Sequence, residues 1–309
     1  MDYIMAMDVG GTKGRLVIRS VQGVVLGEFD SPGWTLQQDG VEGTTFGCSQ
    51  LILPALEKLG LRAGRCRFLC CGAAGVEDEA SARTYERILS GLGLPAERVL
   101  AANDCQLFLL EDEIPSVLIA SGTGSAIWAR GHEGEMARYG GWGNHLSDEG
   151  SACWLVQRSL EYAVRQWDAL TPAVLNQLLA AEAGITSPLE AEAFVRGRMT
   201  EKSHIAALAP LVSKAAAQGD SGVLRIYERG AQALAEGAVL LAKRLDLHEP
   251  TVFLWGSVLL NVDFLQMSLS AILKERLGVT PIPVKKSALE VCLQIAERRV
   301  KAKGKLGHS

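Results

Sequence analysis

The sequence predicts an α/β protein of two lobes with similar designs. Its 309 residues fit about two domains. Apolar residues make up 48% of the chain and charged residues 21%, as in a globular protein with a sizeable core. The most informative observation is that one pattern, strand, glycine turn, strand, occurs near residue 3 and again near residue 116.

The first copy opens the chain. Tyr3 to Met7 is an apolar run that leads into the turn Asp8-Val-Gly-Gly-Thr-Lys13. Strand-like residues resume at Arg15 to Ile18, and Gly23 marks a turn before Val24 to Leu26. This order predicts an antiparallel β-meander whose first turn is rich in glycine.

The second copy follows Pro115. Ser116 to Ala120 is apolar, Ser121 to Ser125 (Ser-Gly-Thr-Gly-Ser) forms the turn, and Ala126 to Ala129 resumes the strand. We expect helices after each meander, since apolar residues there recur at helical spacing. The expected helices are 49–59, 80–89, 151–165, 172–183, 205–217, 222–244 (with Ser221 as N-cap), 262–277 and 288–300. Thr251 to Leu254 and Val279 to Val284 are expected strands.

Two facing glycine turns would suit a nucleotide triphosphate. Glycine lets backbone N–H groups approach phosphate oxygens with no side chain between them. The first turn supplies Gly10, Gly11, Thr12 and Lys13, and the second supplies Gly122, Thr123 and Gly124. Either turn alone has a structural explanation as a tight hairpin.

Two aspartates stand where strands are expected to end. Asp8 beside the first turn indicates a Mg²⁺ ligand, or else a residue that caps its own turn. Asp104, preceded by Asn103, follows the expected strand Val99 to Ala102 and precedes a helical stretch. A carboxylate there can orient a hydroxyl and accept its proton during phosphate transfer; an N-cap aspartate is the alternative.

Two further segments combine glycine with chemistry-bearing side chains. In residues 140–150, Gly141, Trp142 and Gly143 precede the adjacent acids Asp148 and Glu149. Carboxylates accept hydrogen bonds from sugar hydroxyls, so this block predicts a sugar site; glycine turns around a packing Trp142 are the alternative. Gly256 and Ser257 follow the strand ending at Trp255, where a purine could lie against backbone, although such turns are common.

Bulk properties limit the partners. A net charge of -4 and a pI near 5.8 argue against nucleic acid and anionic membranes as partners. No apolar run reaches the roughly 18 residues of a membrane span, and Asp2 stands where a leader would be basic. Seven cysteines without C-x-x-C spacing favour small core residues over a disulfide framework or a zinc site. We therefore expect a cytoplasmic protein.

Taken together, these segments resemble the five motifs of the actin, Hsp70 and sugar-kinase superfamily. They occur in its order: first phosphate loop (Asp8 to Lys13), first connecting segment (Asn103-Asp104), second phosphate loop (Ser121 to Ser125), adenosine loop (Trp255 to Val258) and second connecting helix (Ser287 to Ala296). Gly-Trp-Gly followed by Asp-Glu-Gly-Ser151 and Trp154, and the segment Cys71-Gly-Ala-Ala-Gly-Val76, resemble N-acetylglucosamine kinases within the BadF/BadG/BcrA/BcrD ATPase family.

The resemblance implies two actin-like (ribonuclease H-like) lobes with a nucleotide cleft between them. It predicts an N-terminal lobe at 1–115, a C-terminal lobe with helical insertions at 116–286, and a helix at 287–309 that returns toward the first lobe and ends in a basic tail. It also implies ATP and Mg²⁺ as cofactors and a possible homodimer.

Roles follow position by position from the resemblance. Asp104 would be the catalytic carboxylate, and Thr12 and Thr123 would contact the phosphates. The implied sugar-binding residues are Thr35, Gly75, Asn103, Asp104, Gly141, Trp142, Gly143 and Asp148. The sequence departs from the family pattern at four positions, where Thr35 replaces an Asn and Ser147, Ser257 and Ser287 replace glycines.

The resemblance therefore predicts ATP-dependent phosphorylation of an amino sugar: N-acetylglucosamine, glucosamine or N-acetylmuramic acid. One alternative is a BadF-type ATPase that activates a partner reductase or dehydratase through a cysteine-bound iron–sulfur cluster, for which Cys66, Cys70 and Cys71 are the nearest candidates. Another is a sugar-sensing protein without catalysis.

Overall fold

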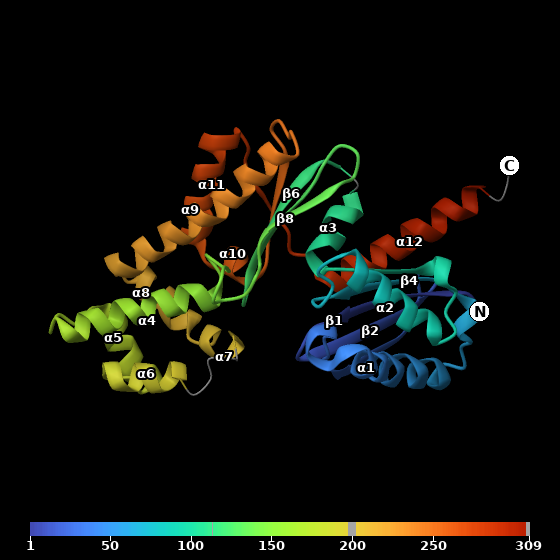
Figure 1. The fold of residues 1–309 in the computed structure, drawn as a ribbon, viewed down its shortest axis with the longest axis horizontal. Coiled ribbons are helices and arrows are strands. Elements are labelled where there is room, and N and C mark those ends of the chain that lie inside the picture. Colours follow the sequence, from blue (N-terminus) through green and yellow to red (C-terminus); the bar gives the residue numbers. More distant parts are fainter. Residues whose placement is uncertain (113, 197–201, 307–309) are drawn as a thin grey trace. The chain divides into compact units, whose positions relative to one another are not determined.

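The chain divides into two compact units (Figure 1). The computed structural model describes residues 1–112, 114–196 and 202–306. Residues 1–113 and 286–309 form unit 1, and residues 114–285 form unit 2. Each unit is built around one five-stranded mixed sheet, so the expected α/β class is confirmed.

Unit 1 contains a sheet with the strand order β3-β2-β1-β4-β5. Its strands are β1 (Tyr3–Val9), β2 (Lys13–Ser20), β3 (Val25–Pro32), β4 (Cys66–Ala73) and β5 (Val99–Ala102). The first three form the expected antiparallel meander, while β4 and β5 run parallel to β1. Central β1 is almost wholly buried because helices cover both faces of the sheet, as its continuous apolar run predicts.

Four helices cover this sheet. They are α1 (Leu36–Lys58), α2 (Glu79–Gly91), α3 (Asp104–Asp112) and α12 (Ala288–Leu306). The helices α1 and α2 share a core with Met5, Met7 and Leu69 of the sheet. On the other face, Leu107 of α3 and Cys292 of α12 lie against Gly72 of β4. The C-terminal helix is therefore part of unit 1, although unit 2 separates it from the rest in sequence.

Helix α1 begins much earlier than the expected residue 49. Thr35 is its N-cap, and its hydroxyl accepts a hydrogen bond from the Gln38 N–H group. The helix is broken at Gly40, whose φ of 63° is not helical. Glycines at 40, 43 and 47 have low helix propensity, so the sequence pattern did not predict a helix before residue 49.

Unit 2 contains a sheet with the strand order β10-β9-β6-β7-β8. Its strands are β6 (Ser116–Ser121), β7 (Ser125–Arg130), β8 (Met136–Gly140), β9 (Thr251–Trp255) and β10 (Ile282–Pro283). Strands β6, β7 and β8 form the second meander, and β9 runs parallel to β6. The strand expected over 279–284 is only two residues long.

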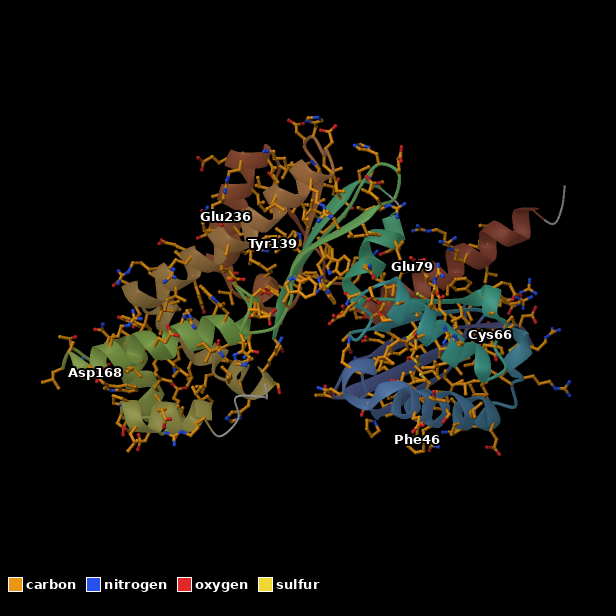
Figure 2. All side chains as sticks on the ribbon, viewed as in Figure 1. Phe46, Cys66, Glu79, Tyr139, Asp168 and Glu236 are labelled. Atoms are coloured by element: carbon orange, nitrogen blue, oxygen red, sulfur yellow. The ribbon has the colours of Figure 1, made fainter. Side chains whose placement is uncertain are left out.

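Helices make up most of unit 2 (Figure 2). They are α4 (Ala152–Asp168), α5 (Val174–Leu178), a π-helical turn (Leu179–Ala183), α6 (Pro188–Arg196), α7 (Lys202–Ala206), α8 (Ala209–Ala217), α9 (Ser221–Arg244), α10 (Ser257–Asn261) and α11 (Asp263–Leu277). The single helix expected over 205–217 is wrong, since Pro210 stands in the first turn of a separate α8. Among the described residues no helix is long and apolar enough to cross a membrane.

The N-cap of α9 also corrects a prediction. Asp220, rather than Ser221, precedes the helix, and its carboxylate accepts hydrogen bonds from the N–H groups of Gly222 and Val223. Its other oxygen accepts from the Leu175 N–H group at 3.0 Å. Asp220 is buried, so these bonds satisfy a charge that would otherwise be costly.

Candidate functional site

In unit 1 the expected site residues meet at one edge of the sheet. Asp8 of β1 is in register with Gly72 of β4, and Gly72 with Ala102 of β5. These three strands are parallel, so the residues after each strand emerge on the same side. The first phosphate loop, the segment 73–75 and Asn103-Asp104 therefore lie along one edge.

The first phosphate loop is a tight hairpin. The Gly10 N–H group donates to the Lys13 carbonyl at 3.0 Å. Gly11 and Thr12 are exposed at its tip, and the Lys13 ammonium lies 3.2 Å from the Asp30 carboxylate. The loop thus presents backbone to solvent at the sheet edge, as a phosphate cradle requires.

Gly33 lies against the backbone of this loop, and the close approach is possible because glycine has no side chain. A Cβ atom there would lie 2.0 Å from the Gly10 carbonyl oxygen and 2.5 Å from the Thr12 nitrogen. Both contacts are with backbone, which cannot rotate away.

We therefore expect Gly33→Ala to displace the loop. Overpacking against backbone should lower the free energy of unfolding by about 1–3 kcal/mol, and ATP affinity should fall at least about tenfold because the loop amides move. Thermal melting and titration with a fluorescent ATP analogue measure both. Gly91→Ala is the matched control, because a Cβ there meets nothing within 4 Å; equal behaviour of the two variants would contradict this account.

Asp8 and Asp104 form an acidic pair in unit 1. Burial raises the pKa of Asp8, and the Asp104 charge raises it further, while Arg15 opposes both. Burial also raises the pKa of Asp104, against hydrogen bonds donated by Cys105. A divalent cation would stabilise the charge of Asp8, which burial and the neighbouring Asp104 carboxylate both disfavour.

The capping role at the start of α3 falls to Asn103. Its Oδ1 accepts from the Cys105 N–H group at 3.0 Å, and its carbonyl accepts from the Leu107 N–H group. Asp104 is the first helical residue, and its Oδ1 also accepts from the Cys105 N–H group, at 2.9 Å. Because Asn103 already caps α3, helix capping does not explain why an aspartate stands at position 104.

Thr35 and Gly75 lie together beside the phosphate loop. A Cβ on Gly11 would be 3.7 Å from the Thr35 methyl group, and one on Gly75 would be 3.4 Å from the Thr35 Cβ. The Gln37 side-chain amide donates to the Gly75 carbonyl at 2.8 Å. The start of α1 is thereby fixed against the segment that follows β4.

In unit 2 three motifs also meet at one sheet edge. Trp255, Ala120, Ala126 and Gly140 are in register across β9, β6, β7 and β8. The residues next to them belong to the adenosine loop, the second phosphate loop and the Gly-Trp-Gly segment. Sequence motifs up to 135 residues apart (residues 121 and 256) are therefore neighbours.

The second phosphate loop is hydrogen bonded to the segment after the Gly-Trp-Gly motif. The hydroxyls of Ser121 and Ser125 donate to the carbonyls of Gly150 and Glu149, each at 2.8 Å. In return, the Ala152 N–H group donates to the Gly122 carbonyl at 2.9 Å. Loop and segment therefore form one rigid block.

Gly256, in the segment predicted as the adenosine loop, packs closely against this block. Its φ is 101°, and a Cβ there would lie 2.3 Å from the Ser121 carbonyl oxygen. Ser257, in place of a second glycine, is exposed, and its hydroxyl lies 3.8 Å from the position of a Cβ on Gly122.

The indole of Trp142 in the Gly-Trp-Gly segment is exposed to solvent. Trp142 is 62% exposed, which does not fit a core-packing role. The Arg138 guanidinium lies 3.7 Å from the centroid of its ring, a cation–π distance that orients the indole. The side-chain hydroxyl of Ser147, which replaces a family glycine, accepts a hydrogen bond from the backbone N–H group of Trp142 at 2.8 Å and closes the loop.

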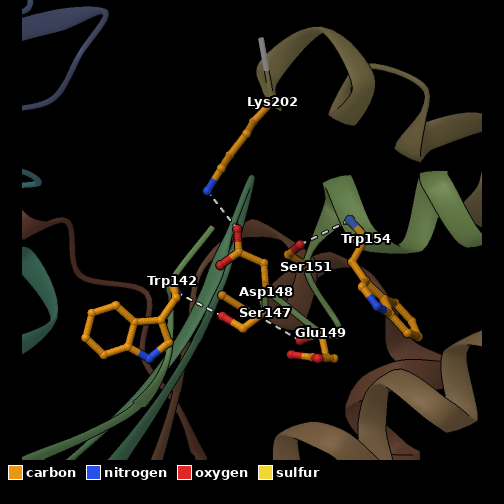
Figure 3. A network of polar contacts seen from close by, with 8 residues as sticks. Trp142, Ser147, Asp148, Glu149, Ser151, Trp154 and Lys202 are labelled. Atoms are coloured by element: carbon orange, nitrogen blue, oxygen red, sulfur yellow. Dashed lines mark hydrogen bonds and ion pairs between the residues drawn. The ribbon is translucent and has the colours of Figure 1, made fainter. Parts of the chain in front are cut away.

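Asp148 lies at the centre of unit 2's site (Figure 3). It is only 2% exposed and has a φ of 79°, unusual for a residue with a side chain. Its Oδ2 accepts from the Lys202 ammonium at 2.7 Å and lies 3.1 Å from the position of a Cβ on Gly124. The carboxylate therefore lies beside the second phosphate loop, and Lys202 links it to the Gly-Trp-Gly segment, since the same ammonium lies 3.9 Å from the position of a Cβ on Gly143.

Sequence reasoning missed Lys202 and Arg138. Lys202 is 54 residues from its partner and stands on a five-residue helix, so no local pattern connects them. Arg138 carries a weak signal, four residues before Trp142, but β8 ends between them. The departure at Ser287 has a local explanation: its hydroxyl and Glu290 exchange hydrogen bonds as a capping box before α12.

The cysteines are core residues. All seven are buried as free thiols. Burial raises the pKa of Cys66 to about 12 and that of Cys71 well above its usual range. Metal and cluster ligation require thiolates, so these positions are poorly suited to it.

Comparison with known proteins agrees with this arrangement. Residues 7–289 match the BadF/BadG/BcrA/BcrD ATPase family. A relative named N-acetylmuramic acid/N-acetylglucosamine kinase, from Clostridium acetobutylicum, is 26% identical over 270 residues, which cover 86% of this chain and 88% of the relative.

Two solved structures share the fold. A candidate N-acetylglucosamine kinase from Porphyromonas gingivalis superposes with a TM-score of 0.74 at 22% identity, over 96% of this chain and 99% of that one. A second candidate, from Chromobacterium violaceum, gives 0.71 at 23% identity, over 97% and 99%. The expected sugar-kinase fold is confirmed, and the match over nearly the whole length shows that this chain belongs to the BadF/BadG/BcrA/BcrD ATPase family.

Proposed function

We propose that the protein is a kinase that transfers the γ-phosphate of ATP to a hydroxyl of an amino sugar, N-acetylglucosamine or a relative such as glucosamine or N-acetylmuramic acid. The observation that carries the proposal is Asp148: its buried carboxylate lies beside Gly124 of the second phosphate loop and pairs with Lys202, whose ammonium lies beside Gly143 of the Gly-Trp-Gly segment. A sugar that hydrogen bonds to this carboxylate would be held next to bound phosphate. The name of the Clostridium relative supports the same substrate class.

Each loop has a defined task in this proposal. In unit 1 the amides of Gly10 to Lys13 and the Thr12 hydroxyl bind phosphate of ATP. In unit 2 the amides of Gly122 to Gly124 and the Thr123 hydroxyl have the same task. The backbone at Gly256 and Ser257 binds the adenosine. The transition state of phosphate transfer is stabilised mainly by positioning and electrostatics. The fixed hairpins that hold the phosphates therefore make the main contribution to catalysis.

The sugar is held by polar groups and by the exposed indole. Asp148 accepts hydrogen bonds from ring hydroxyls, and the Asn103 amide donates to them. Gly75, Gly141 and Gly143 allow close backbone approach. Trp142 covers a face of the ring, and the Thr35 hydroxyl, which accepts from Gln38, still has a proton to donate.

Asp104 orients the acceptor hydroxyl and removes its proton. A raised pKa makes its carboxylate a better base than an exposed aspartate. Asp8 fits a magnesium ligand, since its carboxylate stands beside the phosphate loop and its charge is disfavoured by Asp104. The ion would neutralise phosphate charge; no cluster of three potential ligands occurs in the described residues, so phosphates and water would complete its shell.

A purified-protein assay tests the function. We expect ADP release that depends on an amino sugar, with N-acetylglucosamine, glucosamine, N-acetylmuramic acid, glucose and mannose compared under equal conditions. Activity should be highest with one of the amino sugars. If no hexose or hexosamine stimulates ADP release, the kinase proposal is wrong.

The reductase-activator alternative has less support. Cys66, Cys70 and Cys71 lie inside β4 with buried thiols, where they cannot reach an external cluster without unfolding the strand. Purification without oxygen would decide this independently, because an activator would be brown from its iron–sulfur cluster and a sugar kinase would be colourless.

A further inference from the structure

Lys202 places a positive charge beside Asp148 and the Gly-Trp-Gly segment, the part of unit 2 proposed to bind the sugar. It opens α7, outside all the motifs discussed above, and its ammonium lies 2.7 Å from the Asp148 Oδ2 atom (Figure 3). The same nitrogen lies 3.9 Å from the position of a Cβ on Gly143. It therefore stands between the Gly-Trp-Gly segment and the carboxylate proposed to bind the sugar.

The two partners differ greatly in exposure. The side chain of Asp148 is 2% exposed and that of Lys202 is 38% exposed. A pair that served only to neutralise Asp148 would need no accessible lysine side chain, whereas more than a third of the Lys202 side chain is exposed. An ammonium has three donors and the hydrogen bond to Asp148 uses one of them, so Lys202 can bind a second anion while it stays paired.

We propose that Lys202 determines specificity for amino sugars that carry a carboxylate substituent, by pairing with that carboxylate while Asp148 binds the ring. The inference rests on the proposed kinase function and specifies in addition that the preferred substrate is negatively charged. N-acetylmuramic acid, with its ether-linked hydroxy-acid carboxylate, is the matching probe, and N-acetylglucosamine is the neutral probe that lacks only this group.

Lys202→Gln separates the two roles. The amide still donates a hydrogen bond to Asp148, which keeps the buried carboxylate satisfied, but it has no charge for the substrate. We expect kcat/KM for N-acetylmuramic acid to fall roughly 10- to 100-fold, the range for a lost hydrogen bond between charged groups. For N-acetylglucosamine it should change less than about threefold.

Two variants complete the experiment. Lys202→Arg keeps the charge and should restore most of the activity on the acidic sugar. Lys214→Gln removes a comparable, half-exposed ammonium that pairs with Glu182 on another part of unit 2, and it should affect neither sugar. Added salt should raise the KM of the wild-type protein for N-acetylmuramic acid only.

The outcomes are distinct. Equal losses on both sugars would mean that Lys202 acts only through Asp148, and unchanged kinetics on both would mean that it does not read the substituent; either result overturns the inference. If the wild-type protein phosphorylates N-acetylglucosamine but not N-acetylmuramic acid, the inference fails and the kinase function stands. If it phosphorylates neither these nor any other sugar, the proposed function itself fails.

Discussion

Asp104→Asn should lower kcat by about 10²- to 10⁴-fold, the usual contribution of a general base. The amide has nearly the same shape and can still accept from the Cys105 N–H group, so α3 should begin as before. It cannot take a proton from a hydroxyl. Affinity for ATP should stay within about threefold of wild type, because the phosphate loops are untouched. Steady-state kinetics and ATP-analogue titration measure the two quantities.

Asp168→Asn is the matched control for this substitution. Asp168 is exposed at the end of α4, where Figure 2 labels it, and its replacement should leave kcat unchanged. If Asp104→Asn kept more than a tenth of wild-type kcat, Asp104 would not be the base.

The same variant has a stability signature that does not depend on turnover. Burial raises the pKa of Asp104 in the folded state above its unfolded value of about 3.9. Ionisation therefore disfavours folding, and wild-type stability is lost as pH rises from that value through the raised pKa. Asn carries no charge, so Asp104→Asn should match wild type near pH 3.5 and become the more stable protein at pH 7. Denaturant unfolding at both pH values tests the sign.

Gly256→Ala should give the largest loss of stability of any glycine substitution proposed here. Its φ of 101° disfavours a side chain, at about 1–3 kcal/mol. A Cβ would also lie 2.3 Å from the Ser121 carbonyl oxygen, an overpacking that adds about 1–3 kcal/mol or more. Because Ser121 begins the second phosphate loop, ATP binding should weaken together with the free energy of unfolding.

Gly219→Ala isolates the first of these two effects. Gly219 has a φ of 80°, but a Cβ there meets nothing within 4 Å. It should cost only about 1 kcal/mol, the penalty for the backbone conformation alone. A melting temperature for Gly256→Ala that is no lower than that of Gly219→Ala would contradict the close packing of adenosine and phosphate loops.

The two meanders could be predicted because their signals are local. An apolar run, a glycine turn and a second run specify a hairpin within about 20 residues. The register that aligns Asp8 with Gly72 and Ala102 then follows from parallel pairing, since the residues after parallel strands share one edge. The sequence therefore predicts Asp8 and Asp104 at strand ends, and the structure adds that the charge of Asp104 acts on Asp8.

The features that sequence reasoning missed depend on tertiary contacts. The first turns of α1 contain three glycines, and tertiary packing of Thr44 and Cys48 overrides their low propensity. Asp220 displaced Ser221 as the cap of α9 because its buried carboxylate also satisfies the Leu175 N–H group. Lys202 joins the site only through the fold of α6 and α7, which no periodicity specifies.

Unit 1 is discontinuous in the chain, and this affects the order in which the protein can fold. The sheet face under α12 is covered by Val291, Cys292 and Ile295, which leave the ribosome only after all of unit 2. Unit 2 is continuous, so its core can close during synthesis, while the nascent sheet of unit 1 exposes an apolar face until α12 has been made. A polypeptide that stops before α12 should leave this early-made sheet prone to aggregation and to chaperone capture, although its own strands are intact.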